Sequence, residues 1–263
     1  MKIIVITGST RGIGYGMAGA FLEMGCGVVI SGRQQPAVDQ AVSGLAARFG
    51  AEKVFGFACD VCQLEQVQGL WAAAADHFGR IDIWINNAGV AHPLTDFIDF
   101  KPDTIQTVLE TNIAGLMYGA ITALDGLKKQ GSGAIYNMFG LGSTGRQVKR
   151  MALYGASKSA VAYLTHSLVE ETRGQAVLVG ALLPGMVVTD LLTQQRDSDP
   201  EEWKRASRIF NILADRVETV APWLARRVLE NTKHGAVISW TNPWMIGWRF
   251  LTAPFTHRRV IDE

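Results

Sequence analysis

The chain has 263 residues, and its 25 Lys and Arg nearly balance its 24 Asp and Glu. Apolar residues make up 48% of the sequence and charged residues 19%, which excludes a disordered or fibrous protein and provides for one large core. The formal net charge of +1 gives no basis for a nucleic-acid partner.

The opening residues and the hydropathy pattern bear on the compartment. The sequence MKIIVITGS enters an apolar run at once, without the charged, apolar and small-residue regions of a signal peptide. No run reaches the roughly 18 apolar residues that a membrane-spanning helix needs. We therefore expect a cytoplasmic protein that does not span a membrane.

Short apolar runs rich in Val and Ile alternate along the chain with longer segments of helical periodicity. The runs are apolar on both faces, which is typical of strands in a parallel sheet covered by helices on both sides. Strands are expected at 2–7, 27–31, 53–58, 81–86, 133–138, 176–183 and 236–240, and helices near 12–24, 36–49, 63–78, 102–129, 152–173 and 200–231. This alternation predicts an α/β fold in which residues 1–263 form a single domain, with a Rossmann-type, doubly wound parallel sheet of about seven strands flanked by helices.

The segment TGSTRGIG (7–14) follows the first expected strand and opens the first expected helix. Glycines let the backbone approach a pyrophosphate, and the helix N-terminus offers N–H groups and the positive end of its dipole. Because the glycine spacing occurs between a strand and a helix, the segment predicts a dinucleotide site. Its candidate residues are Gly8, Ser9, Thr10, Arg11, Gly12, Ile13 and Gly14.

The end of the second strand discriminates between the two nicotinamide dinucleotides. An acid at this point binds the ribose 2′-hydroxyl, whereas an Arg suits a 2′-phosphate. In VVISGRQQ the acidic position holds Gly32, and Arg33 follows it. Arg11 can add a second guanidinium, and such groups bind phosphate through bidentate, charge-assisted hydrogen bonds. The sequence therefore predicts NADP(H); the alternative is that both arginines are merely solvated.

The segment YGASK places Tyr154 and Lys158 four residues apart, on one face of an expected helix. A free tyrosine has a pKa near ~10, and a nearby ammonium is expected to lower the pKa of Tyr154. Tyr154 can then donate its proton to a carbonyl oxygen while a hydride reaches the carbonyl carbon. We expect Lys158 also to hold the nicotinamide ribose.

Several motifs follow one another in an order that resembles the short-chain dehydrogenase/reductase family. They are the glycine segment, CDV at 59–61, NNAG at 86–89, LETNIAG at 109–115, YGASK at 154–158 and PGMVVT at 184–189. The resemblance implies that Asp60 contacts the adenine and that Asn112 joins a proton relay with Tyr154 and Lys158. It also implies that NNAG supports the cofactor, that the Pro-Gly segment borders the nicotinamide, and that Thr189 binds its amide. The further cofactor residues implied are Val61, Asn87, Ala88, Gly89, Pro184, Gly185 and Val187.

The serine that this family usually carries after the fifth strand is missing. Asn137 is followed by Met138, Phe139 and Gly140, so the hydroxyl that would polarise the substrate oxygen is lost from its position. Ser143, on a glycine-rich loop, is the candidate replacement. If its side chain points away, Tyr154 and a water must polarise the substrate.

The altered segment, YNMFGLGSTG, resembles the chlorophyll b reductases of the non-yellow-coloring group. The resemblance continues through FNILADRVETVAPWLARRVL and GAVISWTNP. It implies reduction of the 7-formyl group of chlorophyll b to hydroxymethyl with NADPH. Phe139 departs from that group, which usually has an acid there; a Phe suits a flat or apolar ligand, or it simply packs.

Two segments interrupt the alternation of strands and helices. Residues at about 186–215 are expected to form a substrate flap whose closure excludes water from the hydride step. The tail at 240–263 is aromatic and ends in bases. It can pack on the core or on a neighbouring subunit, wall an apolar pocket, or lie on a membrane surface.

The sequence as a whole predicts an NADP-dependent carbonyl reductase acting on an apolar aldehyde or ketone, with the chlorophyll b formyl group or a related tetrapyrrole as the named candidate. The alternatives are a family member acting on a steroid, ketoacyl or small keto substrate, and a non-catalytic protein that senses NADP(H). The family habit implies a homodimer or homotetramer built on the helices near 102–129 and 152–173. The five histidines show no paired metal spacing, so no metal is expected.

Overall fold

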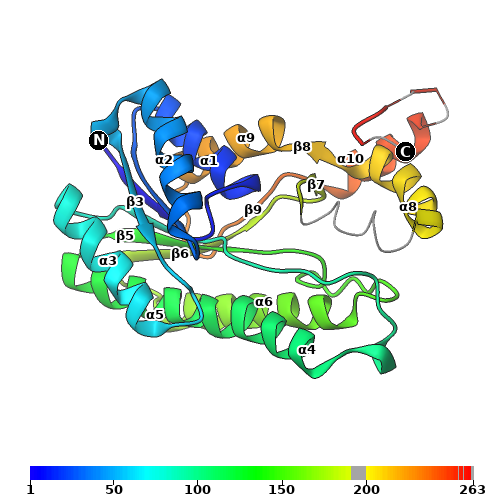
Figure 1. The fold of residues 1–263 in the computed structure, drawn as a ribbon, viewed down its shortest axis with the longest axis horizontal. Coiled ribbons are helices and arrows are strands. Elements are labelled where there is room, and N and C mark those ends of the chain that lie inside the picture. Colours follow the sequence, from blue (N-terminus) through cyan, green and yellow to red (C-terminus); the bar gives the residue numbers. More distant parts are fainter. Residues whose placement is uncertain (191–199, 254, 257, 262–263) are drawn as a thin grey trace.

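The computed structural model describes residues 1–190, 200–253, 255–256 and 258–261, and its centre is a seven-stranded sheet of order β3-β2-β1-β4-β5-β6-β9 (Figure 1). Every neighbouring pair in this sheet is parallel. Its strands are β1 (Ile3–Ile6), β2 (Gly27–Gly32), β3 (Val54–Ala58), β4 (Ile83–Asn86), β5 (Gly133–Met138), β6 (Val177–Leu183) and β9 (Val237–Ser239). The predicted strands and the doubly wound α/β fold are confirmed.

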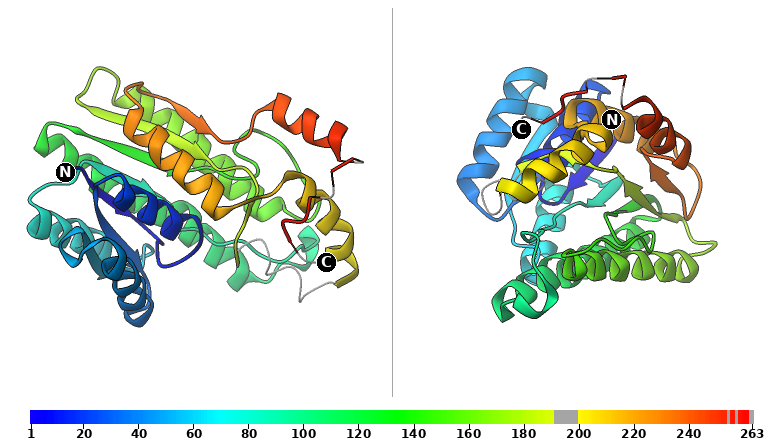
Figure 2. Two further views of the ribbon diagram at one scale, coloured as in Figure 1. Left: turned by 90° about the horizontal axis from the view of Figure 1, so that it is seen from above. Right: turned by 90° about the vertical axis from the view of Figure 1, so that its right-hand side faces the viewer.

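Helices cover both faces of the sheet, as Figures 1 and 2 show from three directions. One face carries α1 (Gly12–Glu23), α2 (Gln35–Phe49) and α9 (Val217–Glu230), and the other carries α3 (Leu64–Phe78), α5 (Gly115–Gln130) and α6 (Ala152–Glu171). The remaining helices are α4 (Pro102–Leu109), α8 (Pro200–Leu213) and α10 (Pro243–Thr252). None of the helices that the structure describes is long and apolar enough to cross a membrane.

The helix predicted over 102–129 contains a wide turn. Between α4 and α5, residues Glu110–Ala114 form a π-turn, and the buried Asn112 lies inside it. A π-turn inserts one extra residue into a helix, and such turns are frequent at functional sites. The sequence pattern indicates the helix but gives no sign of this insertion.

A buried path of polar side chains joins the middle of the sheet to α6. Trp84 Nε1 donates to Asn86 Oδ1 at 2.7 Å, and Asn86 Nδ2 donates to Asn137 Oδ1 on the neighbouring strand at 2.9 Å. Asn137 Nδ2 then donates to Thr165 Oγ1 at 2.9 Å. Because each of these side-chain amides has partners, the core holds them without the cost of unsatisfied polar groups.

The strand order reverses between β1 and β4, and ligands of such sheets bind at the carboxyl ends of the strands beside this point. The glycine segment follows β1 there, and NNAG continues from β4. The fold thus brings the predicted cofactor motifs to one end of the sheet. That end is also the one beside which α8 and α10 lie (Figure 1).

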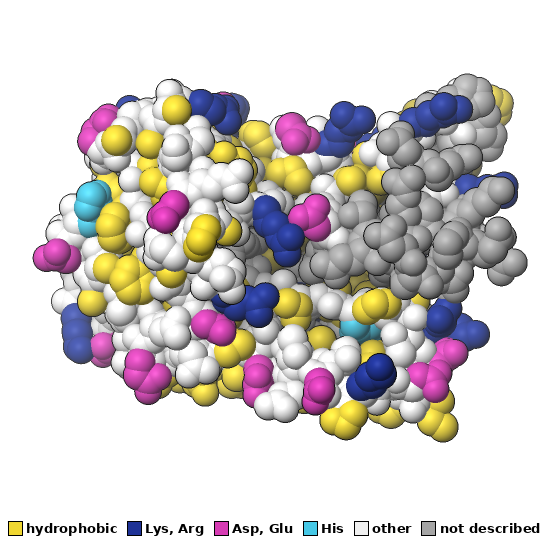
Figure 3. Space-filling view, in the orientation of Figure 1, with side chains coloured by type: hydrophobic (Ala, Val, Ile, Leu, Met, Phe, Trp, Pro, Cys, Tyr) yellow, Lys and Arg dark blue, Asp and Glu magenta, His cyan; other side chains and the backbone are white. Residues whose placement is uncertain are grey.

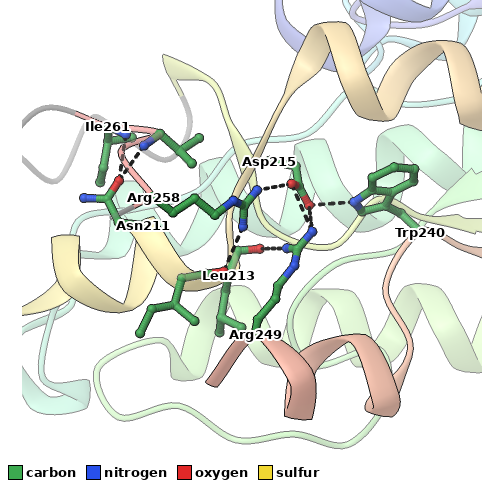
Figure 4. A network of polar contacts seen from close by, with 9 residues as sticks. Asn211, Leu213, Asp215, Trp240, Arg249, Arg258 and Ile261 are labelled. Carbon is green, nitrogen blue, oxygen red and sulfur yellow. Dashed lines mark hydrogen bonds and ion pairs between the residues drawn. The ribbon is translucent and has the colours of Figure 1, made fainter. Parts of the chain in front are cut away.

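The C-terminal tail is attached to the flap region through one buried carboxylate. Asp215 accepts hydrogen bonds from Trp240 Nε1 at 2.7 Å and from Arg249 Nη2 at 2.9 and 3.1 Å (Figure 4). Arg258 forms a further ion pair with the same carboxylate. The two guanidiniums also donate to the carbonyls of Leu213 and Ile212, respectively, at 2.9 Å each. We call this set of contacts the Asp215 clamp; it fixes α10 against the end of α8. Residues 191–199 of the predicted flap lie outside the described residues.

The charge of Asp215 makes the clamp sensitive to acid. Burial opposes ionisation, but the hydrogen bonds from Trp240 and Arg249 and the charges of Arg249 and Arg258 outweigh it and hold the pKa of Asp215 below its ordinary value. The stability that this shift contributes is fully present above about pH 4, the pKa of an unfolded aspartate, and is lost as the pH falls through the lower folded pKa.

We expect Asp215→Asn to lower the free energy of unfolding at pH 7 by about 2 kcal/mol, because it leaves two guanidiniums without their shared carboxylate. Urea unfolding followed by circular dichroism measures this difference, which should shrink below about pH 4. Asp125→Asn is the matched control, since Asp125 forms only an exposed pair with Lys129, worth less than about 1 kcal/mol. Equal stability of the wild type and Asp215→Asn at pH 7 would contradict the clamp.

Candidate active site

The glycine segment packs so closely on the end of β4 that side chains are excluded. Gly8 has a φ of +62°, and a Cβ there would lie 2.8 Å from the Cα of Ala88. A Cβ on Gly14 would lie 2.6 Å from Nδ2 of Asn87. Gly12, with a φ of +60°, begins α1. The loop is therefore a bare backbone cradle, which fits a pyrophosphate.

Hydrogen bonds between Thr7 and Asn87 lock this cradle in place. The backbone amides of Asn87 and Ala88 donate to Thr7 Oγ1 at 3.0 and 3.1 Å. Asn87 Nδ2 donates to the carbonyls of Thr7 and Gly8 at 2.8 and 2.9 Å. The NNAG segment thus holds the glycine loop directly, and its predicted contact with the cofactor stays a prediction.

The N-terminus of α1 has Arg11 as its N-cap residue, and the side chain of Arg11 makes no capping hydrogen bond. Its first amides are therefore suited to bind an anion. Ser9 takes no part in this, because its buried hydroxyl donates to Ile6 O at 2.7 Å and accepts from Ser31 N at 3.0 Å. The Ser9 side chain thus holds β1 against β2, and the predicted cofactor role of Ser9 stays a prediction.

The end of β2 has no room for an acid. A Cβ on Gly32 would lie 2.8 Å from Cγ2 of Thr10. Arg33 beside it is exposed. Arg11 is also exposed, and its Nη1 pairs with Asp190 at 3.1 Å. This weak surface pair is easily exchanged for a phosphate, so the predicted role of Arg11 stays a prediction.

The other predicted cofactor residues line the same end of the sheet. Asp60 Oδ1 accepts from the Cys62 amide at 3.0 Å, which fixes that carboxylate at the end of β3. Thr189 lies beside the glycine segment, since a Cβ on Gly12 would be 3.5 Å from its Cγ2. Val61 and Val187 are buried, and Ile13 packs against the core. Pro184 and Gly185 follow the last residue of β6 and lead into β7 (Val187–Val188).

The catalytic pair sits in the first turns of α6. Lys158 is buried, its Nζ donates to Met138 O at 3.1 Å, and it lies 5.9 Å from the ring centroid of Tyr154. Burial raises the pKa of Tyr154 to about 12 and lowers the pKa of Lys158 to about 8. The predicted lowering of the tyrosine pKa is therefore wrong for this structure, because desolvation raises the pKa of Tyr154. Tyr154 is neutral at pH 7 and holds a proton that it can donate.

Asn112 connects this helix to the NNAG segment. Its Oδ1 accepts from Val90 N at 2.8 Å, and its Nδ2 donates to Val90 O at 2.9 Å and to Ser157 Oγ at 3.0 Å. The Ser157 hydroxyl in turn donates to the carbonyl of Tyr154 at 2.7 Å. Asn112 Oδ1 and Lys158 Nζ lie 3.3 and 3.6 Å from the place of a Cβ on Gly89. The three predicted members of the relay are thus brought together.

Ser143 is oriented into its own loop. Its Oγ accepts from Gly140 N at 3.0 Å and donates to Lys158 O at 3.2 Å. The hydroxyl proton is therefore engaged with the backbone of α6 rather than presented to a substrate. In this structure Ser143 holds the loop against the helix, and its predicted polarising role stays a prediction.

Gly140 shows why the family serine is missing. A Cβ at this position would lie 2.7 Å from the hydroxyl of Tyr154 and 3.3 Å from Cγ of Lys158. The tyrosine therefore occupies the space that a serine side chain would need. Phe139, the preceding residue, is 4% exposed and packs with Leu116 and Val161, so it fills the core and does not line the mouth of the site.

His92 is a site residue that the sequence analysis did not single out. Its ring is 3% exposed, Nδ1 lies 2.7 Å from Pro93 O, and Nε2 accepts the backbone N–H of Tyr154 at 3.2 Å. It thereby caps the first turn of α6 from 62 positions away. No local pattern reveals such a contact. No group of His, Cys, Asp and Glu that could hold a metal ion occurs among the residues that the structure describes.

Comparisons with known proteins agree with this geometry. Residues 2–200 match the family described as short chain dehydrogenase. The chlorophyll(ide) b reductase NOL of Arabidopsis thaliana is 40% identical over 265 residues, which cover 99% of this chain and 73% of that protein. A 3alpha-hydroxysteroid dehydrogenase of Mediterraneibacter gnavus is 32% identical, over 73% of this chain and 76% of that protein.

Among solved structures, ElxO with NADP bound is 27% identical, with a TM-score of 0.79, covering 90% of this chain and 96% of that chain. This chain spans only part of its relatives. It covers 66% of the rice NOL protein and 54% of the chlorophyll(ide) b reductases NYC1 from rice and Arabidopsis thaliana.

We expect Gly140→Ser, which restores the usual family hydroxyl, to lower kcat about tenfold or more, because its Cβ displaces the proton donor. Steady-state kinetics with a fixed carbonyl substrate measure this effect. Gly155→Ala is the control within α6, since a Cβ there meets nothing within 4 Å. A Gly140→Ser variant with unchanged or higher kcat would contradict the close approach of Tyr154.

Proposed function

Since the chain belongs to the short-chain dehydrogenase family, we propose that it is an NADPH-dependent carbonyl reductase whose substrate is a bulky apolar aldehyde. The family makes it an oxidoreductase with a nicotinamide dinucleotide site. The observation that carries the proposed reaction is Tyr154, half-buried beside Lys158 at the cofactor end of the sheet, where its phenol can give a proton to a substrate oxygen. A neutral phenol is a proton donor, and reduction of a carbonyl needs one.

The proposed reaction adds a hydride and a proton across a carbonyl bond. NADPH bound at the glycine segment would supply the hydride for the carbonyl carbon. Tyr154 gives its proton to the carbonyl oxygen, which leaves a phenolate beside the ammonium of Lys158. Lys158, whose pKa of about 8 lies close to neutrality, can return a proton to that phenolate. His92, Asn112 and Ser157 keep the tyrosine in position through its backbone.

Preference for NADPH over NADH is supported by the end of β2. Thr10 fills the space in which an acid would bind a ribose 2′-hydroxyl. Arg33 is exposed at the same point, and Arg11 lies across the glycine segment in a pair that a phosphate can replace. Two guanidiniums and no carboxylate at this position favour a 2′-phosphate.

The proposed substrate is the formyl group of chlorophyll b, chlorophyllide b or a related tetrapyrrole. Support comes from the 40% identity with the NOL reductase over almost the whole chain. Support also comes from Gly140, because the site has lost the usual serine and depends on Tyr154 for its hydroxyl. A generic reductase acting on a steroid or other keto compound is the second candidate, and the similar hydroxysteroid dehydrogenase favours it.

A homo-oligomer is also proposed. On the two long helices α5 and α6, Met117, Ile121 and Tyr163 are 39%, 58% and 78% exposed. Apolar side chains of this size on adjacent helices support pairing with a second copy. The cytoplasmic location expected from the sequence stays a prediction.

We expect Arg33→Ala to raise the KM for NADPH about tenfold or more and to leave the KM for NADH nearly unchanged, because it removes a charged contact to the 2′-phosphate. Steady-state kinetics with both cofactors measure this difference. The control is Arg48→Ala at the far end of α2, where Arg48 pairs with Glu23. Equal losses with both cofactors would contradict the assignment.

The proposed substrate is tested by NADPH consumption with chlorophyllide b and with detergent-solubilised chlorophyll b, beside a panel of simple aldehydes, ketones and steroids. We expect the hydroxymethyl product from the tetrapyrroles and little turnover of the panel. Turnover of the panel alone would replace the substrate and keep the reaction class.

Tyr154→Phe tests the mechanism in the same assay. We expect kcat to fall by at least about 10²-fold while NADPH binding, measured by fluorescence, is retained, because only the donated proton is lost. Tyr163→Phe is the control on the same helix, since Tyr163 is 78% exposed. Activity that survives in Tyr154→Phe would show that another group donates the proton.

A further inference from the structure

The aromatic tail divides into a packed part and an exposed part. Trp240 packs edge-on against Trp223, with ring centroids 5.3 Å apart, and donates to Asp215. Beyond it, Trp244 and Trp248 on α10 are 89% and 67% exposed. Leu251 on the same helix and Phe255 just past its end are 72% and 85% exposed. These four large apolar side chains are therefore not part of the core.

The four residues follow one another at intervals of four, three and four, so they form one stripe along the helix. We call this stripe the aromatic face of α10. Arg249 lies on the opposite side of the helix and is held by the Asp215 clamp (Figure 4). The clamp holds the Arg249 side of α10 toward the protein. The aromatic face therefore points outward.

The tail that carries this face is rich in bases, although Arg249 and Arg258 are paired with Asp215 and the sequence of α8 also contains Glu201 and Glu202. From Asn231 to Ile261 the chain has four Lys or Arg and no Asp or Glu, although the whole chain has 25 and 24; two acids follow at 262–263. Arg259 and, on the neighbouring α8, Arg208 are exposed. Figure 3 shows basic side chains at the end of the molecule that carries α8 and the tail. Arg208 and Arg259 can therefore contact an anionic surface beside the aromatic face.

A second copy of the chain is a poor fit to this face. A helix of ten residues is about 15 Å long and about 10 Å wide, a footprint well below the roughly 800 Å² that each partner of a stable dimer buries. A lipid bilayer has no such area requirement, and the rings of Trp are most stable at the boundary between headgroups and acyl chains. A short amphipathic helix with bases beside its apolar stripe is typical of interfacial binding.

We propose that the aromatic face of α10 docks the protein on the surface of a bilayer that contains anionic lipids. The helix lies in the plane of the membrane, with Trp244, Trp248, Leu251 and Phe255 in the headgroup boundary and the basic side chains on lipid phosphates. This surface adjoins the end of the sheet that holds the active site (Figure 1). The proposal does not depend on the substrate.

Flotation of the full chain with vesicles tests the proposal. One set contains phosphatidylcholine and phosphatidylglycerol in equal parts, and the other contains phosphatidylcholine alone. We expect wild-type protein to float with the anionic vesicles, to bind the neutral ones about tenfold more weakly, and to dissociate as salt is raised. Arg208→Gln with Arg259→Gln should reduce the preference for anionic vesicles.

The decisive variant is Trp244→Ser with Trp248→Ser, for which we expect a loss of vesicle binding of about tenfold or more. The matched control is Phe97→Ser with Ile98→Ser, because these side chains are 77% and 90% exposed on another part of the surface. Circular dichroism and NADPH binding establish that both variants are folded. The proposal is overturned if wild-type protein fails to float with anionic vesicles, or if the control loses binding equally. It is also overturned if the tryptophan variant floats with anionic vesicles as well as wild-type protein does.

Discussion

The active site depends on the contact at which β1 and β4 end side by side. The hydroxyl of Thr7 accepts two amides from the NNAG segment, and the Asn87 side chain returns two hydrogen bonds to the carbonyls of the glycine loop. The glycine loop is thereby held in a fixed position relative to the NNAG segment. This contact also explains why glycine is needed at positions 8 and 14, since a Cβ on Gly8 or Gly14 would collide with Ala88 or Asn87. Hydride transfer requires reacting atoms to be held within fractions of an ångström, and this contact provides a rigid base for that alignment.

Burial then decides the chemistry of the catalytic pair. Removal of Tyr154 and Lys158 from water favours the uncharged form of each, so the tyrosine keeps its proton and the lysine comes close to titrating at neutral pH. Polar groups in such a place need hydrogen-bond partners. The carbonyl of Met138 accepts from Lys158, and His92 and Ser157 bond the backbone of Tyr154. Asn112 in turn donates to the Ser157 hydroxyl. This arrangement keeps Tyr154 protonated and in position before a substrate binds. It leaves little freedom for the loop at 139–143 to carry a second hydroxyl into the site.

The parts of the fold that the sequence predicts are those set by local pattern. Apolar runs indicate the strands, the glycine spacing indicates the loop, and the i, i+4 interval places Tyr154 and Lys158 on one side of α6. Features that depend on distant pairing are beyond such patterns. His92 caps a helix 62 positions away. Asp215 forms ion pairs with two arginines of the tail, whose composition shows only that the tail is aromatic. The direction of the tyrosine pKa was predicted wrongly for the same reason. It depends on how deeply the fold buries the ring, which spacing on a helix does not report.

The π-turn at Glu110–Ala114 determines which face of α5 packs against the sheet. One residue corresponds to about 100° of rotation along a helix, so the extra residue sets the angular phase of everything that follows it. Downstream, Gly119 faces Asn86 and Gly126 faces Trp71 so closely that a Cβ would come within 2.0 and 2.1 Å of them. A regular helix would rotate both glycines away and drive larger side chains into these positions. An insertion or deletion between 102 and 119 is therefore constrained by the rotation that it would impose on α5.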